Sequence, residues 1–172
     1  MKIIDIAFIS LYKSFQQALK VLFMMKYGDE SIDVMADKAL SACLEKIPFM
    51  KVAEVRSEKG EAENRPDRLF RLTTSEGEKV LIAEVKNNGQ PRLARGAASQ
   101  LLRYRNLYPG SYGVFIAPYI SAASAEICRK EGIGFVDFAG NCCLSFDRVF
   151  ISREGNPNPF TEKRVIRSLY YP

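Results

Sequence analysis

The sequence predicts an α/β protein in which helices flank a mixed β-sheet. Three observations lead to this expectation. Two stretches with helical spacing of apolar residues open the chain, a series of strand-like segments separated by turns follows, and two further helical segments then alternate with short apolar strands. With 172 residues, of which 47% are hydrophobic and 26% charged, the chain is ordinary in composition and long enough for one well-buried domain.

Two helices are expected first. Residues 3–25 carry apolar side chains at helical spacing in a broad stripe, which must pack on the core or on a second copy of the chain. A second helix is expected from about residue 30 to residue 47, and Pro48 ends it because proline cannot continue a helix.

Three strands are expected next, at about 51–56, 65–73 and 79–86. The polar segment 57–64 is predicted to be a loop. The turn at 75–78 joins the second and third strands, so we expect these two strands to pair as an antiparallel hairpin.

The second half of the chain alternates helices with strands. Helices are expected at about 93–107 and 122–131, the second capped by Ser121 at its start and Gly132 at its end. The expected strands are short and apolar, and they comprise 112–117, 133–138 and a final hairpin of 142–146 with 148–153.

This order of elements suggests three parts. We expect an N-terminal packing or dimerisation helix over residues 1–28, a core domain over residues 29–155, and a C-terminal tail over residues 156–172. The N-terminus lacks a cleavage site of the secretory type, and no stretch approaches the roughly 20 apolar residues of a membrane span. We therefore expect a cytoplasmic protein with no membrane partner.

Composition excludes several kinds of chemistry. The chain has no histidine, so Ser-His-Asp and Cys-His catalysis, His-ligated zinc and a histidine base are impossible. None of its four cysteines forms a CxxC pair, which favours core thiols over a zinc site. The net charge of +5 favours an anionic partner such as nucleic acid, although many basic proteins bind none.

Two carboxylates and a lysine in the predicted hairpin supply the parts of a metal site. Alternation along a strand places Glu84 and Lys86 on one face. An E-x-K triplet is expected about once by chance in such a chain, but Asp67 lies early in the partner strand, where antiparallel pairing brings it opposite Glu84. We expect both acids to converge on one Mg²⁺ or Mn²⁺ ion, with Lys86 beside the attacking water.

The order Pro66-Asp67…Glu84-Val-Lys86 resembles the signature of the PD-(D/E)XK nuclease superfamily. The resemblance covers roughly residues 30–140 and depends on the order of motifs and elements. It implies a restriction-endonuclease-like αβββαβ core and phosphodiester hydrolysis, with DNA as the expected substrate. It also implies that Asp67 and Glu84 are the metal ligands and that Lys86 is the catalytic lysine.

Gln100-Leu-Leu-Arg-Tyr104 is similar to the Q-x-x-x-Y motif of the RecB-like branch of that superfamily. It lies on the helix after the lysine, and its spacing puts Gln100 and Tyr104 on one helical face. The resemblance implies that these two residues position the substrate or the lysine. It also implies an acid from the first core helix, for which the candidates are Glu30, Asp33, Asp37 and Glu45.

Arginines flank the predicted site. Arg92, Arg95 and Arg103 belong to the helix after Lys86, from which they could reach the phosphates of DNA. A solvated basic face without a ligand is the alternative interpretation.

The segment 133–141 resembles one that recurs in bacterial proteins with a winged helix downstream of such a nuclease-like domain, and residues 160–169 resemble the entry to that winged helix. This implies a downstream DNA-reading domain that is absent from the chain. Asp137 and Asn141 are typical of a tight turn, so we expect a structural role for Asp137.

Three functions are therefore compatible with the sequence. The first is a metal-dependent nuclease. The second is a catalytically inactive nuclease-like module that binds DNA as a transcription regulator or an antitoxin-like partner. The third is an interaction domain that forms a homodimer through the N-terminal helix.

Overall fold

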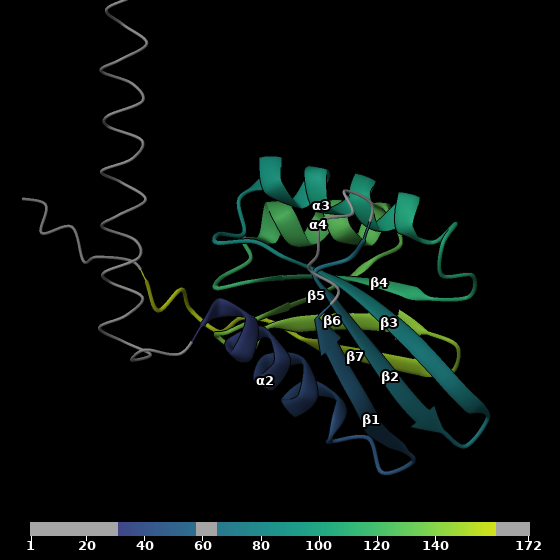
Figure 1. Ribbon diagram of the computed structural model, residues 1–172. Coiled ribbons are helices and arrows are strands. Elements are labelled where there is room, and N and C mark those ends of the chain that lie inside the picture. The colour runs from purple at the N-terminus through teal and green to yellow at the C-terminus, as the bar shows by residue number, and fades with distance from the viewer. Residues whose placement is uncertain (1–30, 58–64, 161–172) are drawn as a thin grey trace, which may run out of the picture. The chain divides into compact units, whose positions relative to one another are not determined.

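The computed structural model describes residues 31–57 and 65–160. Those residues form three helices and one seven-stranded sheet (Figure 1). In chain order the elements are α2 (Ile32–Leu44), β1 (Met50–Ser57), β2 (Arg68–Thr74), β3 (Gly77–Val85), α3 (Pro91–Tyr104), β4 (Tyr112–Ala117), α4 (Ala122–Lys130), β5 (Gly134–Asp137), β6 (Cys142–Phe146) and β7 (Val149–Arg153). The expected helix at 3–25, Glu30, most of the loop at 57–64 and the chain after residue 160 lie outside the described residues.

The seven strands lie side by side in sequence order, from β1 to β7. Strands β1, β2 and β3 are antiparallel neighbours, as are β5, β6 and β7, and short turns join β2 to β3, β5 to β6 and β6 to β7. Helices α3 and α4 connect β3 to β4 and β4 to β5, and these two pairs are parallel because a crossover helix returns the chain to the same end of the sheet. The mixed sheet predicted from the sequence is confirmed.

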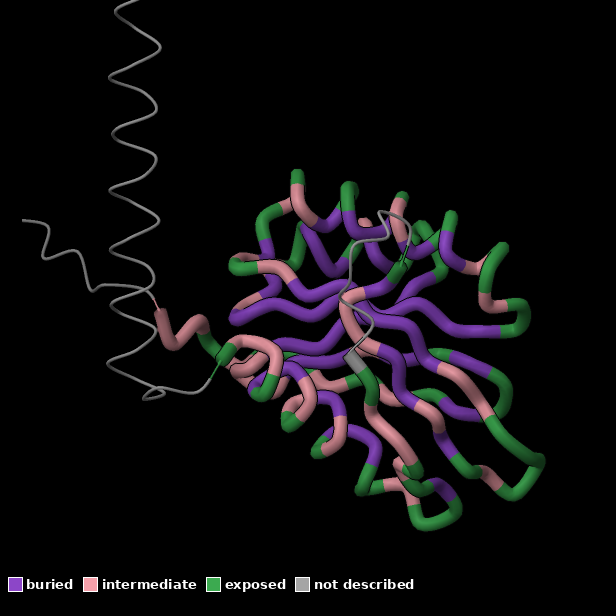
Figure 2. Tube along the Cα trace, viewed as in Figure 1, coloured by how far each residue is buried: buried purple, intermediate pink, exposed green. Residues whose placement is uncertain are grey.

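Helices cover both faces of the sheet. Helix α2 packs on one face, whereas α3 and α4 pack side by side on the other (Figure 1). The central strands β4 and β5 and the second half of β3 are buried between these layers, whereas the edge strands β1 and β7 are partly exposed (Figure 2). Along β3 the side chains alternate, so that Leu81 and Ala83 face the α2 layer and Ile82 faces the α3 layer. Among the described helices, none is long and apolar enough to cross a membrane.

The sheet curves so that the tips of the β2–β3 and β6–β7 hairpins contact each other. Lys79 Nζ, at the β2–β3 tip, lies 2.9 Å from Asp147 Oδ1 in the β6–β7 turn. Arg148 Nε of the same turn lies 3.0 Å from Glu76 Oε1. This curvature encloses the apolar cluster beneath α2.

Three helix ends differ from those predicted. Helix α2 ends at Leu44 and not near residue 47, because a residue before proline, here Ile47, is disfavoured in the helical conformation. Helix α3 begins at Pro91 and not near residue 93, because proline fits the first position of a helix, where no N–H partner is needed. After Tyr104, i→i+3 hydrogen bonds tighten the chain and end α3 before residue 107.

Gly89 marks a close approach between the loop after β3 and the loop after β4. It forms an isolated parallel bridge with Ile120, and its carbonyl accepts a hydrogen bond of 2.6 Å from Ser124 Oγ. A Cβ atom at residue 89 would lie 2.1 Å from the Tyr119 carbonyl oxygen. Only glycine fits there without a shift of backbone.

We expect Gly89→Ala to lower the free energy of unfolding by about 2 kcal/mol, because the methyl group must push two backbone segments apart. Gly96→Ala is the matched control: Gly96 lies in α3 with open space around its Cα, so alanine should raise stability by up to about 1 kcal/mol. Urea unfolding of both variants measures the difference. Equal stability of Gly89→Ala and the wild type would contradict the close approach.

Candidate active site

Asp67 is fixed against the end of β3. It lies one residue before β2, whose first residue Arg68 pairs with Ala83. The Val85 N–H donates a hydrogen bond of 2.9 Å to Asp67 Oδ2. This contact holds a half-buried carboxylate beside the backbone that joins Glu84 to Lys86.

Glu84 and Lys86 form an ion pair at the carboxyl end of β3. Alternation puts Glu84 on the same face as Ile82, beneath α3. The Glu84 side chain is only 2% exposed, and its Oε2 lies 2.5 Å from Lys86 Nζ. The Lys86 side chain is 26% exposed, so its ammonium group lies between the buried acid and solvent.

Tyr104, the last residue of α3, completes the group from the helix layer. Tyr104 is buried, and its hydroxyl interacts with the Glu84 carboxylate, which affects the pKa of both groups. Burial, followed by the negative charges of Glu84 and Asp67, raises the pKa of Tyr104 to about 12. The phenol therefore stays protonated at neutral pH and can donate to the carboxylate.

The two carboxylates repel one another. Burial is the largest cause that raises the pKa of Glu84 above its ordinary value, and the charge of Asp67 raises it further. The hydrogen bonds from Lys86 and Tyr104 and the charge of Lys86 act in the opposite direction. A cation beside both acids would favour their charged forms, since an opposite charge stabilises a carboxylate.

The donor set fits a hard divalent cation. Two carboxylates, with main-chain carbonyls and water for the remaining positions, suit Mg²⁺, which keeps several of its waters. In residues 31–57 and 65–160, no group of three or more acidic or thiol side chains could hold a metal. The candidate first-helix acids Asp33, Asp37 and Glu45 therefore do not complete such a cluster with Asp67 and Glu84, and Glu30 is outside the described residues.

Asp37 has another partner, which sequence reasoning missed. Its Oδ1 accepts a hydrogen bond of 2.8 Å from Arg68 Nε, and its Oδ2 pairs with Arg68 Nη2. This two-point contact ties α2 to the first residue of β2, next to Asp67. No local pattern in the sequence indicates it, because it depends on how α2 lies across the sheet.

Gln100 lies one helical turn before Tyr104 and is half-buried. Within the described part of the chain its side chain makes no hydrogen bond with Asp67, Glu84 or Lys86. The structure thus brings four of the five expected residues together and leaves Gln100 at the edge of the group.

The three arginines expected to contact DNA lie on the outer surface of α3. Arg92, Arg95 and Arg103 are all exposed, and Arg103 Nη1 donates to Ser99 Oγ over 3.2 Å. The opposite face of the helix is formed by buried small and apolar residues, namely Ala94, Ala97, Ala98 and Leu101. Helix α3 therefore presents a basic stripe to solvent and carries Tyr104 on its sheet side.

Asp137 has the structural surroundings expected of a turn residue. Its buried carboxylate accepts hydrogen bonds from Asn141 N at 2.8 Å, Asn141 Nδ2 at 2.9 Å and Ile120 N at 3.1 Å. Burial raises the pKa of Asp137, while these hydrogen bonds act against that rise. Asn141 in turn bonds to the backbone of Asn156. The Asp137 carboxylate therefore links the loops that contain Ile120 and Asn141 directly, and the loop that contains Asn156 through Asn141.

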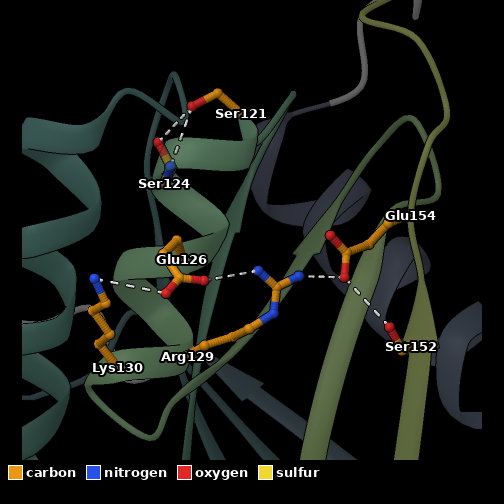
Figure 3. A network of polar contacts seen from close by, with 7 residues as sticks. All are labelled: Ser121, Ser124, Glu126, Arg129, Lys130, Ser152 and Glu154. Atoms are coloured by element: carbon orange, nitrogen blue, oxygen red, sulfur yellow. Dashed lines mark hydrogen bonds and ion pairs between the residues drawn. The ribbon is translucent and has the colours of Figure 1, made fainter.

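A second polar network, on α4, is structural in character. Arg129 contacts Glu126 on its own helix and Glu154 just after β7, while Ser152 donates to Glu154 (Figure 3). The Arg129 guanidinium also lies 5.6 Å from the centre of the Phe135 ring. These partly exposed contacts fasten α4 to the last strand and contribute little energy individually.

No protein-family model matches the sequence, and no curated protein matches it at a significant level. Among solved structures, the chain is similar to EndoMS in its apo form, with 21% identity over 63% of this chain and 46% of that chain and a TM-score of 0.42. It is also similar to an EndoMS–dsDNA2 complex, with 17% identity over 60% of this chain and 44% of that chain and a TM-score of 0.38.

A third similar structure is a repair endonuclease from Pyrococcus abyssi, with 16% identity over 63% of this chain and 47% of that chain and a TM-score of 0.40. The chain spans less than half the length of each of these structures.

Proposed function

We propose that this protein is a metal-dependent nuclease that hydrolyses a phosphodiester bond in DNA. The observation that supports this most is the grouping of Asp67, Glu84, Lys86 and Tyr104 at the carboxyl end of β3. Two acids, one partly exposed cation and an orienting hydroxyl are the parts that such a reaction requires.

Asp67 and Glu84 would hold one Mg²⁺ or Mn²⁺ ion. When bound, that ion would supply an activated water and would offset negative charge on the phosphate. Each acid already has a fixed position, because Asp67 accepts from the β3 backbone and Glu84 is paired with Lys86. This pre-organisation reduces the cost of arranging the ligands.

Lys86 would act on the substrate side of the acids. Its ammonium group is partly exposed, so it can donate to a phosphate oxygen or to the attacking water without leaving its place beside Glu84. Tyr104 is a positioning residue in this scheme, because its hydroxyl contacts the acid and keeps its proton at neutral pH.

The direct test is a cleavage assay with the purified chain. Linear, circular and single-stranded DNA are incubated with Mg²⁺, with Mn²⁺ and with a chelator. We expect cleavage that depends on the divalent ion, and the comparison of linear with circular DNA separates end-dependent from internal cutting. A chain that binds DNA but leaves all three substrates intact under every condition would contradict nuclease activity.

The exposed stripe on α3 is the proposed contact to the DNA backbone. Replacing Arg92, Arg95 and Arg103 together by alanine should weaken DNA binding about tenfold or more. It should also reduce the magnitude of the slope of log affinity against log salt concentration by up to about 3. Fluorescence anisotropy across a salt series measures both. Arg148→Ala, at an exposed arginine of the β6–β7 turn, is the control, and an equal effect there would argue against the stripe.

A second candidate is a nuclease-like module that binds DNA without cutting it, as a regulator or antitoxin-like partner. The Glu84–Lys86 ion pair favours this candidate, because it compensates both charges without a metal. DNA binding that depends on salt, with neither cleavage nor metal affinity, would support it.

Dimerisation through residues 1–28 and a downstream winged helix stay predictions, since residues 1–30 and 161–172 lie outside the described structure.

A further inference from the structure

Two thiols face each other between α2 and β6. Cys43, in the last turn of α2, has its Sγ atom 2.9 Å from the Sγ atom of Cys142, the first residue of β6. The Cys43 side chain is 4% exposed and the Cys142 side chain 1%. Both thiols are free, and 99 positions of sequence separate them.

The charges around this pair favour a thiolate on Cys142. The hydrogen bond from the Cys43 thiol is the largest cause that holds the pKa of Cys142 below its usual range, and the positive charges of Arg153 and Lys46 act in the same direction. Burial and the carboxylate of Asp137 oppose them. Cys43 is the partner that keeps its proton, because that hydrogen bond and burial raise its pKa.

We infer that Cys43 and Cys142 are a redox-sensitive pair that closes to a disulfide between α2 and β6. The sulfur atoms of a disulfide lie about 2.05 Å apart, so the observed separation needs to shrink by only about 1 Å. A metal ion bound to both sulfurs at about 2.3 Å would usually hold them farther apart than they are now. Within the described residues, no third acidic or thiol ligand is grouped with them either.

Hydrogen peroxide is a small oxidant that suits a buried pair. The Cys142 thiolate attacks one peroxide oxygen and breaks the O–O bond, which leaves a sulfenic acid on Cys142 and a hydroxide that takes up a proton. Cys43 then loses its proton, and its sulfur attacks the Cys142 sulfur and expels the second hydroxide, which leaves as water. Overall, two thiols and one peroxide give one disulfide and two waters, with two electrons passing from sulfur to oxygen.

The same molecule contains thiols for comparison. Cys143 is adjacent to Cys142 but, by strand alternation, packs toward the opposite layer. Cys128 is buried in α4, and burial raises its pKa to about 12. A general reactivity of cysteines would modify these residues as well, whereas the proposed pair would react selectively.

The test oxidises the folded chain with a few equivalents of hydrogen peroxide, blocks remaining thiols under denaturing conditions, and digests with trypsin without reduction. Cys43 falls in the peptide 39–46, while Cys142 and Cys143 share the peptide 131–148. Mass spectrometry should find these two peptides joined in the wild type and in Cys143→Ser, and not in Cys142→Ser. Circular dichroism establishes that each variant is folded.

Oxidation should also raise the melting temperature by on the order of 10 °C, because the crosslink closes a long loop in the unfolded chain. This rise should disappear on reduction and be absent from Cys142→Ser. Four alkylated thiols after treatment, a bond between Cys142 and Cys143, or a crosslink that survives in Cys142→Ser would each overturn the inference.

Discussion

Glu84→Gln should lower the rate of metal-dependent DNA cleavage by at least about 100-fold while the protein stays folded. Glutamine has nearly the same shape and can still accept a hydrogen bond from Tyr104, so the buried space under α3 stays filled. It carries no charge, however, and an amide oxygen is a poor replacement for a carboxylate beside a divalent cation. The substitution thus separates the chemical role of Glu84 from its packing.

Lys86→Met is the companion variant. Methionine retains the apolar stem of the lysine but removes the ammonium group that lies 2.5 Å from Glu84. We expect a loss of similar size in cleavage, with little change in DNA affinity, if the amine acts on the reacting phosphate or water.

Single-turnover assays at matched enzyme concentration measure these rates. Lys130→Met, at an exposed lysine of α4, controls for loss of one positive charge. Cleavage by Glu84→Gln or Lys86→Met at the wild-type rate would show that the replaced residue does not have the role assigned to it, even if the wild type is a nuclease.

Asp137→Asn should lower the free energy of unfolding by about 3 kcal/mol. The buried carboxylate accepts three hydrogen bonds, from Ile120 N, Asn141 N and Asn141 Nδ2. An amide in its place offers one acceptor oxygen and turns an NH₂ group toward donors, so buried N–H groups lose their partner.

Glu126→Gln is the matched control for Asp137→Asn, because it makes the same chemical change at an exposed residue of α4. We expect it to change stability by less than about 0.5 kcal/mol. Urea unfolding followed by circular dichroism measures both variants. An Asp137→Asn protein as stable as Glu126→Gln would show that the turn does not depend on the carboxylate.

Much of the fold follows from local patterns in the sequence. Alternation of side chains placed Glu84 and Lys86 on one face, and the short turn at 75–78 required the antiparallel pairing that brings Asp67 to the end of β3. Asp137 and Asn141 are four residues apart, so their turn could also be predicted from nearby sequence. The buried strand Tyr112–Ala117 has the predicted bounds because apolar residues fill it completely.

Contacts between distant elements could not be predicted in this way. The Asp37–Arg68 pair and the Cys43–Cys142 contact depend on where α2 lies on the sheet, which no spacing within one element encodes. Gln100 is a further example of this limit. Helical spacing placed it on the side of Tyr104, but the packing of α3 on the sheet decides which of the two residues interacts with Glu84.

Diffraction from crystals soaked in Mn²⁺, measured at a wavelength where manganese scatters anomalously, tests the proposed metal site most directly. We predict one anomalous peak at about 2.0–2.3 Å from a carboxylate oxygen of both Asp67 and Glu84, and its loss in Glu84→Gln crystals. A peak elsewhere, or none while Glu84 stays paired with Lys86 at saturating Mn²⁺, would contradict a metal-dependent nuclease at this position.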